Sequence, residues 1–146
     1  MMADDPFRFS TTLEVRWRDL DPLGHVNNAV YFTYLEQARI HYLHELGIGS
    51  RDPAGIGIIL AEASCQFKSP LELGERVTIR ARISELRNSS FVFEYRLEGE
   101  DGRLVATARS AQVCYDYQAQ RPIPMPDEWR RTISAYESRI TDHQSQ

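Results

Sequence analysis

Apolar and polar residues alternate at the start of the chain and then change their period. Over residues 7–17, Leu13, Val15 and Trp17 alternate with polar neighbours, which predicts a strand with one face on a core. Over residues 29–48 the apolar residues recur at steps of three and four, which predicts an amphipathic helix. Its apolar stripe consists of Tyr31, Leu35, Ala38, Tyr42 and Leu46. Further apolar residues widen this stripe, so we expect neighbouring elements to enclose most of the helix.

The remainder of the chain is rich in strand patterns. After a loop expected at residues 49–55, four strands are predicted, at residues 56–67, 76–83, 91–97 and 103–117. A change of phase near Leu60 and Ala61 predicts a bulge in the first of them. Residues 127–140 predict a short helix, and we expect the polar residues after it to fray.

This order of elements favours an α+β fold. Strands joined by short turns form an antiparallel sheet, and a long helix with a broad apolar stripe must bury that stripe against one face of it. The length of 146 residues favours one domain, spanning residues 1–146.

Composition and charge exclude several classes of function. The formal net charge is -4 and Lys and Arg form no block, so we expect neither a nucleic acid nor a membrane surface as partner. No apolar run is long enough to span a bilayer, and the acidic N-terminus does not resemble a signal peptide, so a cytoplasmic location is expected. The two cysteines lie in apolar runs without metal-ligand spacing, so no metal site is predicted.

Polar chemistry is concentrated in residues 18–28, RDLDPLGHVNN, between the first strand and the long helix. The segment DPLG has the residues of a β-turn, with Asp21 first and Gly24 fourth. Asn27 or Asn28 can cap the helix. Turn and cap formation are sufficient structural reasons for each of these residues taken alone.

The same residues taken together suit attack on a carbonyl group. A helix N-terminus presents unpaired N–H groups and the positive end of the helix dipole, which can hold a developing oxyanion. Asp21, a few residues upstream, can attack a carbonyl or activate a water that does so. His25 adds a donor or proton carrier, unless it only packs or bonds to the backbone. No other nucleophile motif competes, since GxSxG, P-loop and GxGxxG patterns are all missing from the sequence.

The segment VRWRDLDPLGHVNNAVYFTYLEQAR resembles the signature of the hotdog-fold acyl-CoA thioesterases, in the 4-hydroxybenzoyl-CoA thioesterase-like family. The resemblance consists of D-x-D-x-x-G-x-V followed by an aromatic-rich helix that carries E-x-A-R. It extends to FKSPLELGERVTI, SSFVFEY and VCYDYQAQRPIPMP, and so covers nearly the whole chain.

The resemblance implies a hotdog fold, in which a curved antiparallel β-sheet wraps around one long central α-helix. It implies hydrolysis of an acyl-CoA thioester to the free carboxylic acid and CoA, with Asp21 as general base or nucleophile. The oxyanion donor is then a backbone N–H at the helix start, which maps to Asn28. It also implies a homodimer or homotetramer with active sites between subunits. Coenzyme A is part of the substrate, and no cofactor is expected.

Candidate substrate-binding residues follow from the same resemblance. The family binds the phosphates of CoA near the hairpin between the middle strands, often on the partner subunit. Here that hairpin carries Arg87, Asn88, Ser89 and Ser90, and Arg82 and Lys68 are further candidate cations. Tyr31 and Tyr34 are candidates for the acyl pocket, although their places on the apolar side of the helix are at least as typical of core residues.

Three alternatives differ from acyl-CoA hydrolysis. Plant acyl-carrier-protein thioesterases have a similar run to HVNN, but their acidic carrier needs a basic docking face, and this chain is acidic overall. A hotdog dehydratase usually pairs a His with an acid from another element, a pattern that the sequence does not show. A non-catalytic acyl-CoA-binding module has no need of a carboxylate beside a helix start, which makes Asp21 an argument for catalysis.

Overall fold

The computed structural model describes residues 5–49 and 56–144, and its elements follow the predicted order. They are β1 (Phe9–Glu14), the 3-10 turn η1 (Trp17–Asp19), α1 (Asn28–Glu45), β2 (Ile56–Phe67), β3 (Arg76–Leu86), β4 (Ser90–Glu98), β5 (Leu104–Asp116), β6 (Arg121–Pro122), α2 (Asp127–Tyr136) and β7 (Thr141–Asp142). The loop expected at residues 49–55 lies, from residue 50 onward, outside the described residues.

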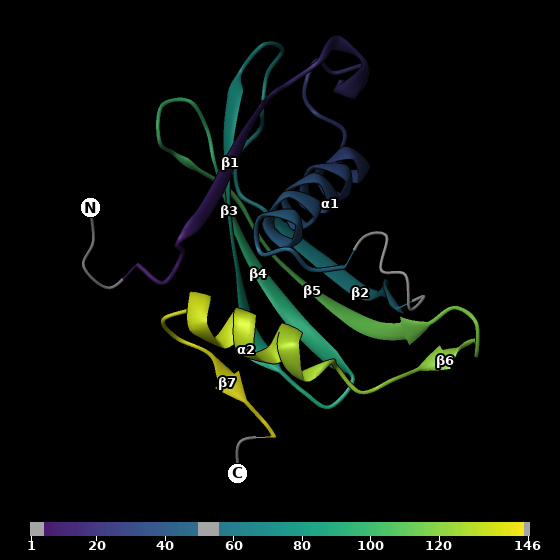
Figure 1. Cartoon of the computed structure of the whole chain (residues 1–146). Helices are drawn as coiled ribbons and strands as arrows, with labels where there is room; N and C mark the ends of the chain where they lie inside the picture. The colour runs from purple at the N-terminus through teal and green to yellow at the C-terminus, as the bar shows by residue number, and fades with distance from the viewer. Residues whose placement is uncertain (1–4, 50–55, 145–146) are drawn as a thin grey trace.

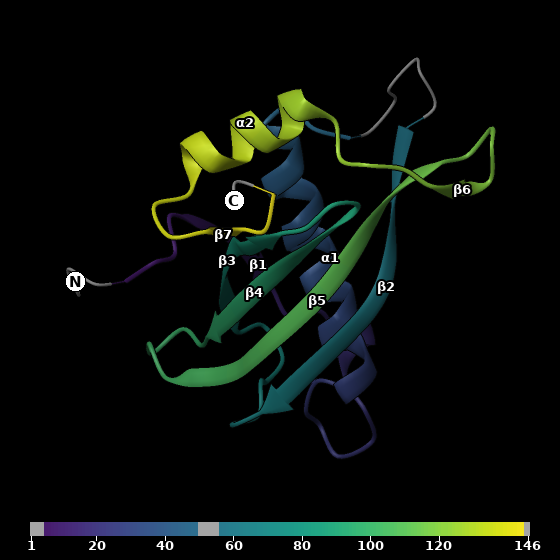
Figure 2. The same ribbon diagram turned by 90° about the horizontal axis from the view of Figure 1, so that it is seen from below.

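The strands form one curved sheet that wraps around α1, as Figures 1 and 2 show. The sheet order is β1-β3-β4-β5-β2, and all of these neighbours pair antiparallel. The helix α2 lies across the end of the sheet that is nearest the C-terminal end of α1 (Figure 2). The predicted α+β class, with an antiparallel sheet around one long helix, is confirmed. In this order β2 forms one edge of the sheet.

The core lies between α1 and the concave face of the sheet. The four inward positions predicted for β3, Val77, Ile79, Ala81 and Ile83, have no exposed surface. The stripe of α1 is buried as predicted except for Leu46, which lies just past the helix end and is half-buried, and the residues that widen the stripe join this core or pack against it. Burial of apolar area on this scale is the main force that closes the sheet over the helix.

Two local predictions about strands had different outcomes. The bulge expected near Leu60 and Ala61 is confirmed by a register shift between Leu60 and Glu62 where β2 pairs with β5. The expectation that the C-terminal residues fray is wrong for Thr141 and Asp142, because β7 pairs in parallel with the end of β3, and residues 145–146 lie outside the described residues. The carboxylate of Asp142 also binds the guanidinium of Arg130 at 2.6 Å, which ties this segment to α2.

One carboxyl group lies inside the core, where α2 ends. Glu137 is 5% exposed, and its Oε2 accepts the hydroxyl of Tyr42 and, at 3.1 Å, the backbone N–H of Ile83. That N–H is next to the β3 bulge between Ile83 and Glu85. Burial raises the pKa of Glu137, and the two hydrogen bonds only partly offset it.

The buried carboxyl group makes stability depend on pH. Because the pKa of Glu137 is higher in the folded chain, its protonated form favours folding, and this contribution is lost as pH rises through the folded pKa. We predict that Glu137→Gln becomes progressively more stable relative to the wild type as the pH rises from about 4 through the folded pKa of Glu137. Urea unfolding at several pH values measures this difference. The control is Glu128→Gln, on the exposed side of α2, and a pH-independent difference for Glu137→Gln would contradict the account.

Candidate active site

The two aspartates of the connection between β1 and α1 have opposite environments. Asp19 is 2% exposed, and its carboxylate accepts the backbone N–H of Arg16 at 2.9 Å, the Arg16 guanidinium at 2.9 Å and the Tyr34 hydroxyl at 2.8 Å. Burial alone raises the pKa of Asp19, but the hydrogen bonds from Arg16 and Tyr34 outweigh it and hold that pKa below its usual range. Asp19 is therefore a fixed anion that ties the connection to α1.

Asp21, in contrast, is oriented but keeps a free oxygen. The N–H of Gly24 donates to the carbonyl of Asp21 at 3.0 Å, which closes the predicted turn. The Asp21 Oδ1 accepts the N–H of Leu23 at 2.9 Å. Gly24 has a φ of 87°, which explains the glycine at this position. Among the described residues, none donates to Oδ2 of Asp21, and the side chain is half-exposed. One oxygen is thus held by the turn, while the other accepts no hydrogen bond from the described residues.

The first turn of α1 begins directly after this hairpin. Asn27 is the cap, since its Oδ1 accepts the N–H of Ala29 at 2.8 Å. The Asn27 N–H itself donates to the carbonyl of Asp19 at 2.9 Å, which fixes where the helix starts. Asn28 is exposed, and within residues 5–49 and 56–144 its backbone N–H has no acceptor. The positive end of α1 therefore presents an open donor next to the turn that holds Asp21.

His25 lies on the opposite side of the same turn. Its carbonyl accepts the N–H of Asp21 at 2.8 Å, and its backbone forms a bridge with Glu72. The imidazole is exposed and bonds to no side chain or carbonyl in the described part of the chain. The backbone of His25 thus shapes the turn, and its ring is available to a ligand.

The predicted substrate residues near this end of the sheet fall into two environments. Tyr31 is 2% exposed, and its ring packs on Phe67 with centroids 5.0 Å apart. Burial raises its pKa to about 12. Tyr31 therefore lies in the core rather than on an open surface. Lys68 follows Phe67, so this exposed cation lies at the end of β2 that adjoins the start of α1.

The hairpin of Arg87, Asn88, Ser89 and Ser90 lies at the other end of the sheet. It follows Leu86, the last residue of β3. The turn that contains Asp21 instead adjoins the segment before Arg76, which is the first residue of β3. The hairpin and the turn that contains Asp21 are therefore separated by the length of β3, about 30 Å. The Arg87 guanidinium also pairs with Glu85 at 2.9 Å. The structure does not bring this hairpin together with Asp21 of the same chain.

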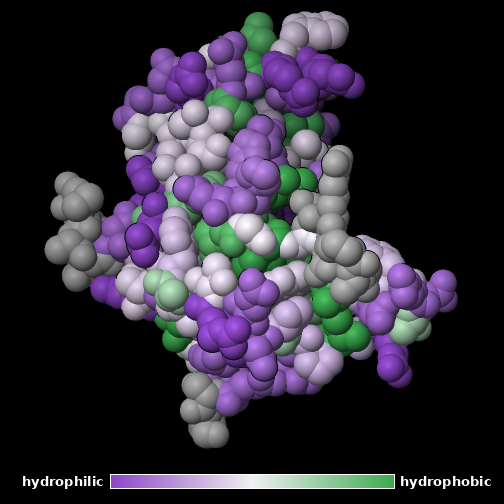
Figure 3. Space-filling view, in the orientation of Figure 1, coloured by the Kyte–Doolittle hydropathy of each residue, from purple (hydrophilic) through white to green (hydrophobic). Residues whose placement is uncertain are grey.

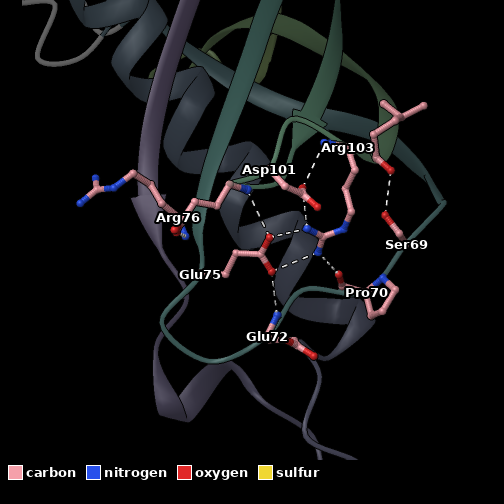
Figure 4. A network of polar contacts seen from close by, with 9 residues as sticks. Ser69, Pro70, Glu72, Glu75, Arg76, Asp101 and Arg103 are labelled. Carbon is pink, nitrogen blue, oxygen red and sulfur yellow. Dashed lines mark hydrogen bonds and ion pairs between the residues drawn. The ribbon is translucent and has the colours of Figure 1, made fainter.

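A network of polar contacts supports the turn from the side of the sheet (Figure 4). Arg103, from the β4–β5 turn, donates to both carboxylate oxygens of Glu75, at 2.6 and 3.0 Å. It also donates to Asp101 at 2.9 Å and to the carbonyl of Pro70. The hydrogen bond from Arg103 lowers the pKa of Glu75, so this pair stays charged. We call these four residues the Arg103 clasp.

The Arg103 clasp holds the segment on which the active-site turn rests. Between Pro70 and Glu75, the carbonyl of Leu71 accepts the N–H of Val26 at 3.1 Å, and Glu72 bridges to His25. Leu71 has no exposed surface. The turn is therefore fixed from two sides, by Asp19 and Tyr34 toward α1 and by the Arg103 clasp toward the sheet.

Sequence reasoning did not find these supporting residues. Asp19 carried a signal, because it is the first acid of D-x-D, but only the position of Tyr34 nearly two turns into α1 shows that Asp19 is buried. Arg103 and Glu75 lie on separate connections far apart in the sequence. No local pattern predicts that they meet.

Other reactive groups in the described residues do not form a competing site. Burial raises the pKa of Cys65 to about 11 and that of Cys114 to about 12, so both thiols stay protonated near neutral pH. Within residues 5–49 and 56–144, no three His, Cys, Asp or Glu side chains are grouped so that they could hold a metal ion. The helices of that part of the chain are all too short or too polar to cross a membrane.

Comparison with known proteins gives one consistent answer. Residues 15–133 match the model of the Thioesterase-like superfamily. The chain is similar to the long-chain acyl-CoA thioesterase FadM of Escherichia coli, with 28% identity over 84% of this chain and 95% of that protein. It is also similar to the acyl-acyl carrier protein thioesterase ATL3 of Arabidopsis thaliana, with 31% identity over 81% of this chain and 63% of that protein.

The solved structures agree with this comparison. The crystal structure of the PA5185 protein from Pseudomonas aeruginosa superposes with a TM-score of 0.82 and 28% identity, covering 93% of this chain and 96% of that one. Several further structures of the same fold, with thioesterase in their names, align at similar scores. The sheet that wraps around α1 is therefore a hotdog fold.

The Arg103 clasp should have a measurable effect on the turn. We predict that Arg103→Met lowers the free energy of unfolding by about 1–3 kcal/mol, because it leaves the Glu75 carboxylate unpaired. It should also speed hydrogen exchange at the Val26 amide by at least about tenfold. The control is Arg109→Met, which breaks the exposed pair with Glu62 and should change stability by less than about 0.5 kcal/mol. Unchanged exchange at Val26 in a destabilised Arg103→Met protein would show that the clasp does not support the turn.

Proposed function

Because the chain belongs to the Thioesterase-like superfamily and is a thioester hydrolase, we propose that it hydrolyses acyl-CoA with Asp21 and the Asn28 N–H as its catalytic pair. One observation carries this proposal: an oriented carboxylate with a free oxygen lies beside a helix start with an open donor. The substrate is an acyl-CoA, and the products are the carboxylic acid and CoA.

The chemistry follows from the two groups. In one route Asp21 removes a proton from a water, which attacks the thioester carbonyl. In the other the carboxylate attacks the carbonyl itself, forming an anhydride that water then cleaves. In both, the oxyanion of the tetrahedral intermediate accepts the N–H of Asn28, and collapse expels the CoA thiolate. His25, whose ring bonds to no described group, is the donor that we assign to the protonation of that thiolate.

The function requires a second copy of the chain. The edge strand β2 has twelve residues, and no described strand pairs with its outer side. It exposes Ile59, Leu60 and Phe67, at 38%, 49% and 42%, and Figure 3 shows hydrophobic surface along α1 and β2. A long, apolar, unpaired edge is a template for another strand. We infer that two chains pair antiparallel through β2, which makes the sheet continuous across a two-fold axis.

This pairing would complete the active site. Antiparallel pairing places the Ile56 end of one β2 beside the Phe67 end of the other, and so beside the partner's α1 start. The β3–β4 hairpin lies at the Ile56 end, because Ser90 and Ile59 both pair with Val113. The partner's Arg87–Ser90 hairpin is thereby brought toward Asp21 and Lys68. In this arrangement the hairpin and Lys68 bind the phosphates of CoA. The distance between the hairpin and Asp21 within one chain is then no obstacle, because the hairpin comes from the partner.

An acyl-carrier-protein thioester is the second candidate substrate. The similarity to the plant enzyme ATL3 favours it. The net charge of -4 opposes it, because acidic carriers need a basic docking face. Measuring turnover of the CoA thioester and of the carrier-protein thioester of the same acyl group separates these candidates. A cytoplasmic location stays a prediction.

Loss of the Asp21 carboxylate should abolish most of the activity. We predict that Asp21→Asn lowers the turnover of acyl-CoA by at least about a hundredfold, measured as thiol release. Asparagine keeps the acceptor for the Leu23 N–H, so the turn should survive. Asp116→Asn is the matched control, because Asp116 also caps a turn, through the N–H groups of Gln118 and Ala119. A folded Asp21→Asn protein with wild-type turnover would reduce Asp21 to a turn residue.

The dimer is tested by placing a charge on the edge strand. We predict that Leu60→Asp lowers the mass measured by light scattering to that of one chain and lowers turnover by at least about tenfold, since a charge at a sheet edge opposes pairing. Leu104→Asp is the control, as Leu104 is similarly exposed, at 41%, but lies on β5. A monomeric Leu60→Asp protein with full activity would overturn the two-chain site.

A further inference from the structure

A cavity separate from the Asp21 turn lies between the C-terminal half of α1 and the start of β2. Its volume is about 580 Å³, a size typical of small-molecule sites. Apolar side chains form most of its lining, with Leu43 and Ile58 on facing elements. Charged and polar side chains also line it, among them Arg39 and Gln112. We call it the α1–β2 cavity.

A buried chain of hydrogen bonds runs behind Arg39. Its guanidinium donates to the Tyr95 hydroxyl at 3.1 Å, that hydroxyl contacts Ser110 Oγ at 2.6 Å, and Ser110 donates to Gln112 Oε1. Gln112 in turn donates to the carbonyl of Phe91 at 3.2 Å. Tyr95, Ser110 and Gln112 are all nearly inaccessible, at 2%, 1% and 0%. Because Ser110 donates to Gln112, Tyr95 donates to Ser110 and accepts from Arg39. The direction of every bond is therefore set.

This chain of bonds holds Arg39 without using up its donors. A guanidinium carries five N–H donors, and the only one bonded in the described residues goes to Tyr95. Glu36, one turn earlier, lines the same cavity, yet Arg39 forms no ion pair within residues 5–49 and 56–144. Arg39 is only half-exposed. A ligand that fills the cavity and displaces water from Arg39 must supply an oxygen acceptor, or leave the charge unpaired.

We propose that the α1–β2 cavity receives the end of the acyl group remote from the thioester, and that Arg39 selects acyl groups that carry an oxygen there. The chemical class is an acyl chain with a terminal hydroxyl or carboxylate. This inference rests on the proposed function, because β2 pairing brings the cavity of one chain toward Asp21 of the other. Within one chain, Glu36 at the near end of the cavity is already about 12 Å along α1 from Asn28.

The test compares thioesters of equal length. Octanoyl-CoA, 8-hydroxyoctanoyl-CoA and the half-thioester of octanedioic acid are assayed with the wild type, Arg39→Met and, as a matched control, Arg131→Met on the exposed face of α2. We expect the wild type to prefer an oxygenated substrate by at least about tenfold in kcat/KM, as for a hydrogen bond to a charged donor. Arg39→Met should lose that preference, whereas Arg131→Met should keep it. Comparing the substrate with a terminal hydroxyl and the substrate with a terminal carboxylate shows whether Arg39 prefers a neutral or a charged oxygen acceptor.

A binding measurement keeps this inference distinct from the proposed function. Calorimetric titration of 8-hydroxyoctanoic acid and octanoic acid into Asp21→Asn protein reports the cavity without any turnover. Tighter binding of the hydroxy acid, lost in a protein that also carries Arg39→Met or Ile58→Trp, supports the cavity even if no thioester is cleaved. Ile58→Trp fills the cavity without touching Tyr95, so it serves if Arg39→Met does not fold. Equal affinity for the two acids, or a preference that survives both substitutions, overturns the inference.

Discussion

The carboxylate of Asp19 is the interaction on which the active site depends. It is buried at the junction of β1, the polar connection and α1, and hydrogen bonds from Arg16 and Tyr34 keep it charged there. Its backbone carbonyl also accepts the N–H of the helix cap, Asn27. One residue therefore sets both where the helix begins and where the following turn lies. An anion held this way is costly to bury and costly to unpair, which makes the geometry rigid.

Because Asp19 holds the turn in place, Asp21 is available to take part in the reaction. The two acids are two residues apart, but Asp19 has its acceptors filled, whereas Asp21 has an oxygen to which no described residue donates. The Arg103 clasp supports the same turn from the sheet, through Leu71 and Val26. Catalysis by a carboxylate and a helix N-terminus needs such support, because electrostatic stabilisation is effective only when the donors are already in place.

Periodicity predicted the parts of the fold that depend on one element at a time. The stripe of α1 and the alternation of β3 are local, and both were confirmed. The turn DPLG and the cap at Asn27 followed from their own residue types in the same way. Contacts between distant segments were not predictable. Nothing in the C-terminal residues shows that Thr141 pairs with Glu85, and nothing near Arg103 indicates Glu75. The α1–β2 cavity likewise exists only once helix and strand have packed.

The central claim is that Asp21 of one chain works with the α1–β2 cavity of its partner, and mixed dimers test it most directly. With octanoyl-CoA as substrate, we expect each variant alone to be nearly inactive, because Asp21→Asn lacks the carboxylate and Ile58→Trp leaves no room for the acyl end. The two variants are combined by joint unfolding and refolding. Half of the dimers should be mixed and have one intact site, so activity should return to roughly a quarter of the wild-type value. A mixture no more active than its two parents would place carboxylate and cavity in the same chain and contradict the claim.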